Sequence, residues 1–325
     1  STLRNIVWVS KKWNNKLLWK WLTNFAPQAV FIACGGSVHP YKIAYEISVK
    51  FKIPIFLYFG DDYLLPYFAL NAFRWINWFW LRKTINRILP LVDSAFVICE
   101  EMVEAYEKIL GNICHVLMTP VNLSEYDYFR AEKGNKAKVD SEIRIAYFGG
   151  LHLNRWKSLI SLVQAIKTVS ERSRISASLT IYSTSSPNKR MMSRIRELEP
   201  YVIFAGSVNE KEIVAEMMKF DVLVHAESFD RINRHKTRLS ISTKIPEYLA
   251  TGKCLLAIGP KEIASIRYLA RTGSAYVVNS LDSRILEESV LKISEDSGFK
   301  KGIIEKNIKL AKKNHSAKIT REKVL

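Results

Sequence analysis

The sequence predicts an α/β protein with two Rossmann-like domains that face each other across a cleft. Short apolar runs of strand length alternate with helical runs, and the pattern restarts after a polar, glycine-containing segment at residues 131–141. Strands that are buried on both faces and joined by helices form parallel sheets. A chain of 325 residues is long enough for two such domains. We therefore expect residues 1–130 and 142–300 to fold as separate units joined by the linker 131–141.

Four apolar runs in residues 1–130 predict the strands of the first sheet. A helical run at about residues 41–51 follows the first strand, and residues 100–110 predict a helix that ends at Gly111. The predicted strands are residues 29–33, 54–59, 95–99 and 115–118.

The second half repeats this alternation of strands and helices. Residues 157–171 have the apolar periodicity of a helix, and the basic stretch 301–325 predicts a terminal helix that could pack back on the first domain. Ligands of open parallel sheets bind beyond the carboxyl ends of the strands, where we expect Gly149-Gly150 and Gly206-Ser207. The predicted strands are residues 143–148, 178–182, 202–204, 221–225 and 254–258.

The stretch 242–260, STKIPEYLATGKCLLAIGP, predicts a short helix followed by a strand. Pro246 lacks a backbone N–H and clashes with a preceding helical turn, so the helix cannot begin much earlier. Ser242 or Thr243 is expected to be the N-cap, and Gly252 to end the helix in the left-handed conformation.

The first turn of this helix combines hydrogen-bond donors, a cation and a carboxylate. Free backbone N–H groups at Lys244 and Ile245, beside the lysine charge, would attract phosphate. Glu247 lies about one turn further along the helix, where its carboxylate could accept two hydrogen bonds from sugar hydroxyls. Phosphate together with a vicinal diol describes a nucleotide. The alternative is a capped amphipathic helix whose Glu and Lys are solvated.

Charge and cysteine usage narrow the function classes. The formal net charge of +18 implies anionic partners, which are nucleotide phosphates, acidic membrane lipids or nucleic acid. No RNA- or DNA-binding motif appears, which argues against nucleic acid. The four cysteines form no CxxC pair and the six histidines are scattered. We therefore expect a reducing, cytoplasmic setting and no metal site.

Five segments carry a resemblance that covers most of the chain. IPIFLYFGDD resembles a strand that leads to the acceptor side of a cleft. VDSAFVICEEMVEAY is similar to a segment that contains a strand, and TPVNLSEYDYF resembles a motif close to an interdomain linker. YFGGLHLNRWKSL looks like the loop that opens a donor domain. The most specific match is FAGSVNEKEIVAEMMKFDVLVHAESF followed by STKIPEYLATGKCLLAIGP. Together they resemble glycosyltransferases of the GT-B fold, closest to the family-4 group of retaining nucleotide-sugar transferases.

The resemblance implies roles for individual donor-side residues. Glu247 matches the carboxylate that holds the ribose hydroxyls, and the turn of Ser242, Thr243 and Lys244 matches the one that contacts the diphosphate. Arg155 falls where a cation neutralises the leaving phosphates. The remaining implied donor-binding positions are Gly149 and Gly150 in the opening loop, and Gly206, Ser207 and Val208 in the segment that passes close to the base.

The chain departs from the family pattern at three points. Gly150 stands where the family usually has an arginine, and Lys244 could replace that cation. Leu239 stands where the family has the first Glu of a pair. Glu227 or Asp230, in the insertion-like stretch before the turn, could take over its contact with the donor sugar. The family's first strand and glycine loop would precede residue 1, so we expect a fragment or a processed chain.

The acceptor side offers three candidate catalytic residues. The resemblance places Asp61 where such proteins carry a catalytic or acceptor-orienting group. Asp61 or Asp62 could orient or deprotonate the acceptor hydroxyl, or stabilise the positive anomeric centre. His39, on a glycine loop, is the rival base. The alternatives are structural, since the two carboxylates could cap the next helix and the histidine could be held in its Val-His-Pro turn.

Residues 63–90 mix aromatic side chains with cations. Polar residues interrupt this segment too often for it to span a bilayer, but aromatic residues beside cations suit a membrane interface. We hypothesise that this helix rests on the inner leaflet and brings the protein to a lipid-linked acceptor, and the alternative is a buried helix of the first domain. The residues concerned are Trp75, Trp78, Phe79 and Trp80 with Arg74, Arg82, Lys83 and Arg87.

The sequence therefore predicts a glycosyltransferase that uses a nucleotide-diphosphate sugar, with a glycan or lipid-linked molecule as acceptor. The leaving diphosphate would be stabilised by cations and helix amides, without a metal or a cofactor. The resemblance implies retention of configuration and a role in bacterial cell-surface polysaccharide assembly at the inner membrane face. The alternatives are a nucleotide-sugar epimerase or hydrolase, and a non-catalytic, degenerate GT-B nucleotide-binding protein.

Overall fold

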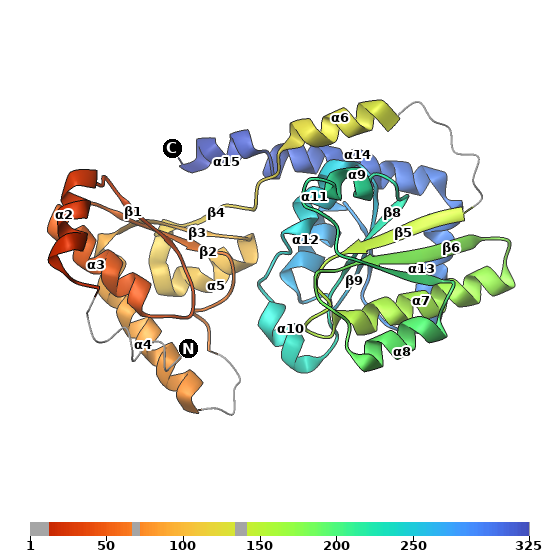
Figure 1. The fold of residues 1–325 in the computed structure, drawn as a ribbon, viewed down its shortest axis with the longest axis horizontal. Helices are drawn as coiled ribbons and strands as arrows, with labels where there is room; N and C mark the ends of the chain where they lie inside the picture. Colours follow the sequence, from red (N-terminus) through yellow and green to blue (C-terminus); the bar gives the residue numbers. More distant parts are fainter. Residues whose placement is uncertain (1–12, 67–71, 134–141, 325) are drawn as a thin grey trace. The chain divides into compact units, whose positions relative to one another are not determined.

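The protein folds into two compact units, residues 1–117 and 118–325, each with its own parallel sheet (Figure 1). The computed structural model describes residues 13–66, 72–133 and 142–324. The predicted class of two Rossmann-like α/β units is confirmed. Each unit is described by itself below.

The first unit has a sheet of four parallel strands in the order β1-β2-β3-β4. Its central strand β2 alternates buried and half-buried residues, and Ile55, Leu57 and Phe59 are fully buried on one face. The strands are β1 (Val30–Ala33), β2 (Ile55–Phe59), β3 (Val92–Val97) and β4 (Cys114–Val116). The helices are α2 (Lys16–Phe25), α3 (His39–Phe51), α4 (Ala72–Ile88) and α5 (Glu100–Leu110), with 3-10 turns η1 (Leu89–Leu91) and η2 (Gly111–Ile113).

Helix α5 has the bounds that its sequence predicts. Glu100 and Glu101 lie in its first turn, where acidic groups favour the helix dipole. Gly111 follows its last residue with φ of +72°, a conformation that costs glycine little because it has no Cβ.

The second unit has six parallel strands in the order β10-β9-β8-β5-β6-β7. Counted within the unit this is the 3-2-1-4-5-6 order of doubly wound sheets, and the direction of winding reverses between β5 and β8. Ligands of such sheets bind at this switch point. The strands are β5 (Glu142–Phe148), β6 (Ser176–Tyr182), β7 (Val202–Gly206), β8 (Val222–Ala226), β9 (Cys254–Ile258) and β10 (Tyr276–Val278).

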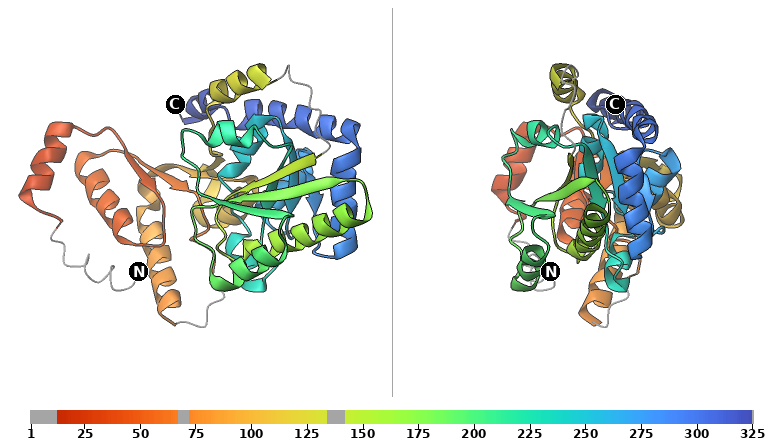
Figure 2. Two further views of the ribbon diagram at one scale, coloured as in Figure 1. Left: turned by 45° about the vertical axis from the view of Figure 1, so that its right-hand side comes forward. Right: turned by 90° about the vertical axis from the view of Figure 1, so that its right-hand side faces the viewer.

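Helices cover both faces of this second sheet (Figure 2). Helix α7 buries Leu159, Leu162, Val163 and Ile166 completely, and it packs against β6, β8 and α13. The helices are α6 (Leu123–Lys133), α7 (Arg155–Arg172), α8 (Lys189–Glu197), α9 (Ile213–Met217), α10 (Arg231–Thr237), α11 (Lys244–Thr251), α12 (Ala264–Thr272), α13 (Ser283–Glu295), α14 (Ser297–Asn314) and α15 (Ala317–Val324).

The boundary between the units does not lie at the expected linker 131–141. Helix α6 precedes that stretch, yet it packs against α9 and α11 of the second unit. The guanidinium of Arg130 donates to the backbone oxygen of Ala250, and Val121 pairs with Ser316. The polar stretch, of which residues 134–141 lie outside the described ranges, therefore connects two elements of the second unit. Most of α14 lies in the terminal basic stretch, and this helix packs against α11 and β9 of its own unit.

Candidate functional site

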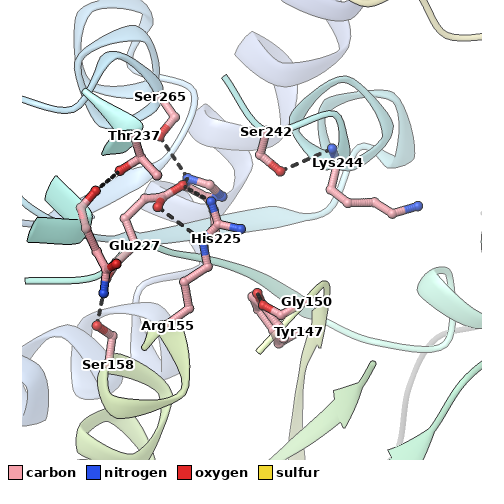
Figure 3. Close-up of polar contacts among 11 residues, drawn as sticks. Tyr147, Gly150, Arg155, Ser158, His225, Glu227, Thr237, Ser242, Lys244 and Ser265 are labelled. Carbon is pink, nitrogen blue, oxygen red and sulfur yellow. Dashed lines mark hydrogen bonds and ion pairs between the residues drawn. The ribbon is translucent and has the colours of Figure 1, made fainter. Parts of the chain in front are cut away.

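The loops that follow β5 and β8 lie at the switch point of the second sheet. Gly149 and Gly150 follow the last residue of β5, and Glu227 follows the last residue of β8. These two strands are neighbours and run parallel, so their carboxyl ends share one edge. Figure 3 shows both loops beside the start of α7 and of α11.

Tyr248 ties α11 to the end of β5. Its hydroxyl donates to the backbone oxygen of Phe148 at 2.9 Å and accepts from the backbone N–H of the same residue at 2.9 Å. Burial raises the pKa of Tyr248 well above its ordinary value, so the hydroxyl keeps the proton that it donates. The first turn of α11 is thereby placed close to the loop after β5.

Side chains of the loop after β5 lie close to its two glycines. A Cβ on Gly149 would lie 2.7 Å from the hydroxyl oxygen of Tyr147, and one on Gly150 would lie 2.3 Å from Nδ1 of His152. The Tyr147 hydroxyl donates to the backbone oxygen of Gly150 at 2.9 Å. The two glycines therefore let the backbone turn closely around side chains of the same loop.

Arg155 and Glu227 form a two-pronged ion pair at the switch point. Nε of the arginine is 3.1 Å from Oε2 of the glutamate, and Nη2 is 3.0 Å from Oε1. The side chains are only 15% and 2% exposed. In such a dry environment each charge depends on the other, because neither can be solvated fully. The predicted phosphate cation and the predicted sugar-binding carboxylate are thus brought together and bind each other.

The Glu227 backbone is held as firmly as its carboxylate. Its oxygen accepts from the Ser158 hydroxyl at 2.7 Å, and its N–H donates to the oxygen of Ile258 at 2.8 Å. A Cβ on Gly259 would lie 2.9 Å from Cβ of Glu227, so glycine makes room for this residue. Glu227 is therefore fixed by α7 and β9 as well as by Arg155.

His225 lies beside the carboxylate of this ion pair and is uncharged. Its Nε2 is 3.5 Å from Oε1 of Glu227 and 3.0 Å from Oγ of Ser265. Burial, assisted by the charge of Arg155, lowers the pKa of His225 to about 3. The contact with Glu227 is therefore polar rather than ionic at neutral pH.

Lys244 and Glu247 form a second pair at the start of α11. Nζ lies 2.9 Å from Oε1 and 2.8 Å from Oε2. These side chains are 28% and 24% exposed, so water and a ligand can reach this pair more easily than the pair of Arg155 and Glu227.

The free amides expected at the start of α11 are occupied. The N–H of Lys244 donates to the Ser242 hydroxyl at 3.3 Å, and that of Ile245 donates to the Ser242 backbone oxygen at 3.0 Å. Thr243 holds the N-cap position without a side-chain cap bond. The expectation was wrong because the turn folds back on Ser242 and satisfies itself. The predicted end of the helix is confirmed, since Gly252 is left-handed with φ of +65°.

Asp230 belongs to a polar cluster at the start of α7. Its carboxylate accepts from Asn154, and Nζ of Lys157 lies 3.2 Å from each of its oxygens. The hydrogen bond from Asn154, with help from Lys157, lowers the pKa of Asp230. This carboxylate joins α10 to α7.

Comparison with known protein families finds one family that the second unit resembles. Residues 142–296 match the family model described as Glycosyl transferases group 1. The second unit therefore contains a region similar to the group 1 glycosyltransferases. No curated protein matches this sequence.

Solved structures extend the likeness to both units and show the GT-B fold. The Anabaena protein HepE in complex with UDP is 14% identical, with a TM-score of 0.68 over 97% of this chain and 82% of that one. A glycosyltransferase from Rickettsia africae is 14% identical, with a TM-score of 0.67 over 95% and 78%. Sucrose-phosphate synthase from Thermosynechococcus elongatus is 13% identical, with a TM-score of 0.66 over 94% and 74%.

The third segment predicted to bind the donor lies further along the second sheet. Gly206, with φ of +76°, ends β7, which is two strands away from β5. Its backbone oxygen accepts from the N–H of Ser183 at 2.7 Å, and Ser207 is exposed. Gly206, Ser207 and Val208 thus follow β7 as expected, and their contact with a base stays a prediction.

The candidate catalytic residues of the GT-B acceptor side occupy different environments in the first unit. Asp62 is buried, and its Oδ1 accepts from the Tyr106 hydroxyl at 2.9 Å and from the Leu65 N–H at 3.2 Å. Asp62 is therefore hydrogen-bonded within its own unit, and these contacts are not those of a helix cap. Asp61 is exposed at the end of β2, and His39 is the first residue of α3. Their roles in catalysis stay predictions.

Sequence reasoning missed the residues that support the site. Tyr248, His225, Ser158 and Ser265 had no assigned role, and each acts through a contact between residues that are distant in sequence. The one local signal was a buried histidine inside an apolar strand run, which predicts an internal hydrogen-bond partner. Across the described ranges, no group of three or more metal-ligating side chains gathers.

Two buried histidines predict loss of stability in acid. Burial lowers the pKa from 6.5 to about 3 for His225 and to about 4 for His315. Below pH 6.5 the unfolded chain binds protons that the folded chain does not, so the folded state becomes less stable as the pH is lowered. We expect the free energy of unfolding to drop by roughly 1.4 kcal/mol per pH unit for each histidine. Urea denaturation between pH 6.5 and pH 4 should show a shallower dependence of this free energy on pH for His315→Asn than for the unchanged protein.

Proposed function

We propose that this protein transfers a sugar from a nucleoside diphosphate sugar to an acceptor hydroxyl. The observation that carries the proposal is the gathering, at one switch point, of the tight loop after β5, the Arg155–Glu227 pair and the first turn of α11. This is the place where doubly wound sheets bind phosphorylated ligands. It lies within the region similar to the group 1 glycosyltransferases.

Lys244 and Glu247 are the proposed contacts for the nucleotide. Because their pair is partly exposed, a diphosphate can take the lysine while the ribose diol takes the carboxylate. Lys244 then exchanges a carboxylate for a phosphate, and Glu247 exchanges the ammonium group for two neutral hydroxyl donors, so each keeps hydrogen-bond partners. Ser242 and Thr243, in the same turn, would contact the phosphates through hydroxyl or backbone groups.

Lys244, rather than Arg155, is proposed to meet most of the charge that develops on the leaving diphosphate. The carboxylate of Glu227 largely cancels the field of Arg155, whereas Lys244 can release its partner to the ribose. Stabilising charge that grows in the transition state is what lowers the barrier. Glu227 is then a positioning residue for Arg155, and Asp230 is the rival for a contact with the donor sugar.

We propose uridine as the donor base, because the structurally similar HepE was solved with UDP and with UDP-glucose. A glycan or lipid-linked acceptor, retention of configuration and a role in cell-surface polysaccharide assembly are proposed from the resemblance to family-4 transferases. A reaction without a metal is proposed from the cation set at the switch point. On the acceptor side, Asp61 is the proposed catalytic or orienting carboxylate, with His39 as the rival base.

A second candidate function is nucleotide binding without transfer. It is favoured by Leu239, a buried apolar side chain where the family has its first Glu. Under this alternative UDP would still bind, but incubation with UDP-sugars and acceptor glycans would release no UDP.

A thermal-shift screen against UDP, GDP, ADP and CMP tests the donor proposal. At about a hundredfold excess over Kd, a ligand adds about 2.7 kcal/mol, which is roughly 5 to 10 °C for a unit of this size. We expect UDP to give the largest rise, and Lys244→Met to remove most of the advantage of UDP over uridine. Equal shifts from all four nucleotides, or none from any, would contradict the proposal.

A further inference from the structure

Helix α4 presents an apolar face that is about half exposed. We call the side chains of Phe73, Trp75, Ile76, Phe79 and Trp80 the aromatic face, and they are between 44% and 64% exposed. Their spacings of three and four residues place them along one side of a helix. Figures 1 and 2 show the start of α4 extending away from the sheet of the first unit.

The other side of α4 is anchored. Leu81, Ile85 and Ile88 are almost completely buried. The indole N–H of Trp78 donates to the oxygen of Leu64 at 2.9 Å, and the Asn77 amide donates to the oxygen of Gly36 at 2.8 Å. The alternative of a buried helix therefore accounts for this side alone. Because this side is fixed, the aromatic face stays directed outward.

Cations accompany the aromatic face, and the helix has no acidic side chain. The 17 residues of α4 include Arg74, Arg82, Lys83 and Arg87 and neither Asp nor Glu. Lys83 is exposed just beyond the aromatic face, and Arg74 is exposed in the first turn of the helix. Two copies of such a helix would repel each other, whereas an anionic surface would attract it.

We propose that α4 docks the protein on the surface of an anionic lipid bilayer. The aromatic face would lie at the boundary between headgroups and acyl chains, where Trp and Phe are favoured, with Arg74 and Lys83 beside lipid phosphates. None of the helices in the described ranges is long and apolar enough to cross a membrane, so the contact is interfacial. Docking itself does not depend on the donor chemistry, and only its use, access to a lipid-linked acceptor, rests on the proposed function.

Co-flotation of the full chain with lipid vesicles tests the docking. At low salt we expect the protein to float with vesicles of mixed phosphatidylcholine and phosphatidylglycerol, and much less with phosphatidylcholine alone. The pair Phe79→Ser and Trp80→Ser should lower the bound fraction at least about tenfold, since it removes both aromatic anchors. The pair Arg74→Glu and Lys83→Glu should lower it by at least about tenfold as well, because each basic residue near the surface contributes about fivefold.

Matched controls lie in the second unit. Ile232→Ser with Ile285→Ser changes two exposed apolar residues, and Lys301→Glu with Lys309→Glu changes two exposed cations. Both pairs should keep vesicle binding close to that of the unchanged protein. Thermal unfolding and UDP binding of every variant show whether it is folded and whether its donor site is intact.

Three results would overturn the docking proposal. The first is no binding of the unchanged protein to anionic vesicles at low salt. The second is an equal loss in the control pairs, which would assign binding to overall charge. The third is a dimer that the α4 variants dissociate, with no vesicle binding, which would make the face a contact between copies. If UDP fails to bind while flotation persists, the donor proposal fails and the docking stands.

Discussion

Arg155→Met is expected to lower the free energy of unfolding by roughly 3 to 5 kcal/mol, as measured by urea denaturation at neutral pH. The substitution keeps an unbranched apolar chain but leaves the Glu227 carboxylate, 2% exposed, without its ionic partner. A buried charge that loses its partner keeps its desolvation cost.

The double variant Arg155→Met with Glu227→Gln should recover most of this loss, because no charge then remains unpaired. The matched control is Arg194→Met on α8, which breaks an exposed pair with Glu197 and should leave the free energy of unfolding close to that of the unchanged protein. Equal decreases in the free energy of unfolding for Arg155→Met and Arg194→Met would show that the Arg155–Glu227 pair does not stabilise the fold.

Glu247→Ala is expected to lower kcat/KM for the donor roughly 10- to 100-fold, through two charged hydrogen bonds to ribose hydroxyls. Because Glu247 is partly exposed and its partner Lys244 can reach water, the fold should change little. Initial rates of UDP release, together with UDP titration by calorimetry, measure the effect. Donor binding and turnover should fall together.

The control for this variant is Glu197→Ala on α8. That residue forms the same i,i+3 ion pair with Arg194 but lies on an exposed surface helix. It should leave donor kinetics unchanged. A Glu247→Ala enzyme with normal turnover would remove the carboxylate from the donor site, and loss of the folded state would make its effect structural.

Most of the fold could be predicted because its apolar runs are sharply bounded. Strand β9 (Cys254–Ile258) has the predicted ends, since Gly252 and Gly259-Pro260 stop the adjacent structure. Strand β10 was missed because it has only three residues. Helix α10 was missed because RINRHKT has no apolar periodicity. Asp230, immediately before it, is held instead by Asn154 and Lys157 of another segment.

The residue types of the candidate site could be predicted, but their partners only in part. The spacing of Lys244 and Glu247 already favours an i,i+3 pair on a helix. Arg155 and Glu227 are 72 residues apart, and only the adjacency of β5 and β8 brings them together. The sequence pattern predicts strands without their order in a sheet. From the sequence alone, Arg155 and Glu227 are therefore each predicted to bind a ligand, and their contact with each other is not predicted.

The position of α6 bears on how the two units can be separated genetically. A gene cut at the polar stretch would assign α6 to the wrong half, leaving Ala250 without Arg130 and Ser316 without Val121. Swapping donor specificities between relatives therefore calls for a junction near residue 118. A chimaera joined there would inherit α6 together with the helices on which it rests.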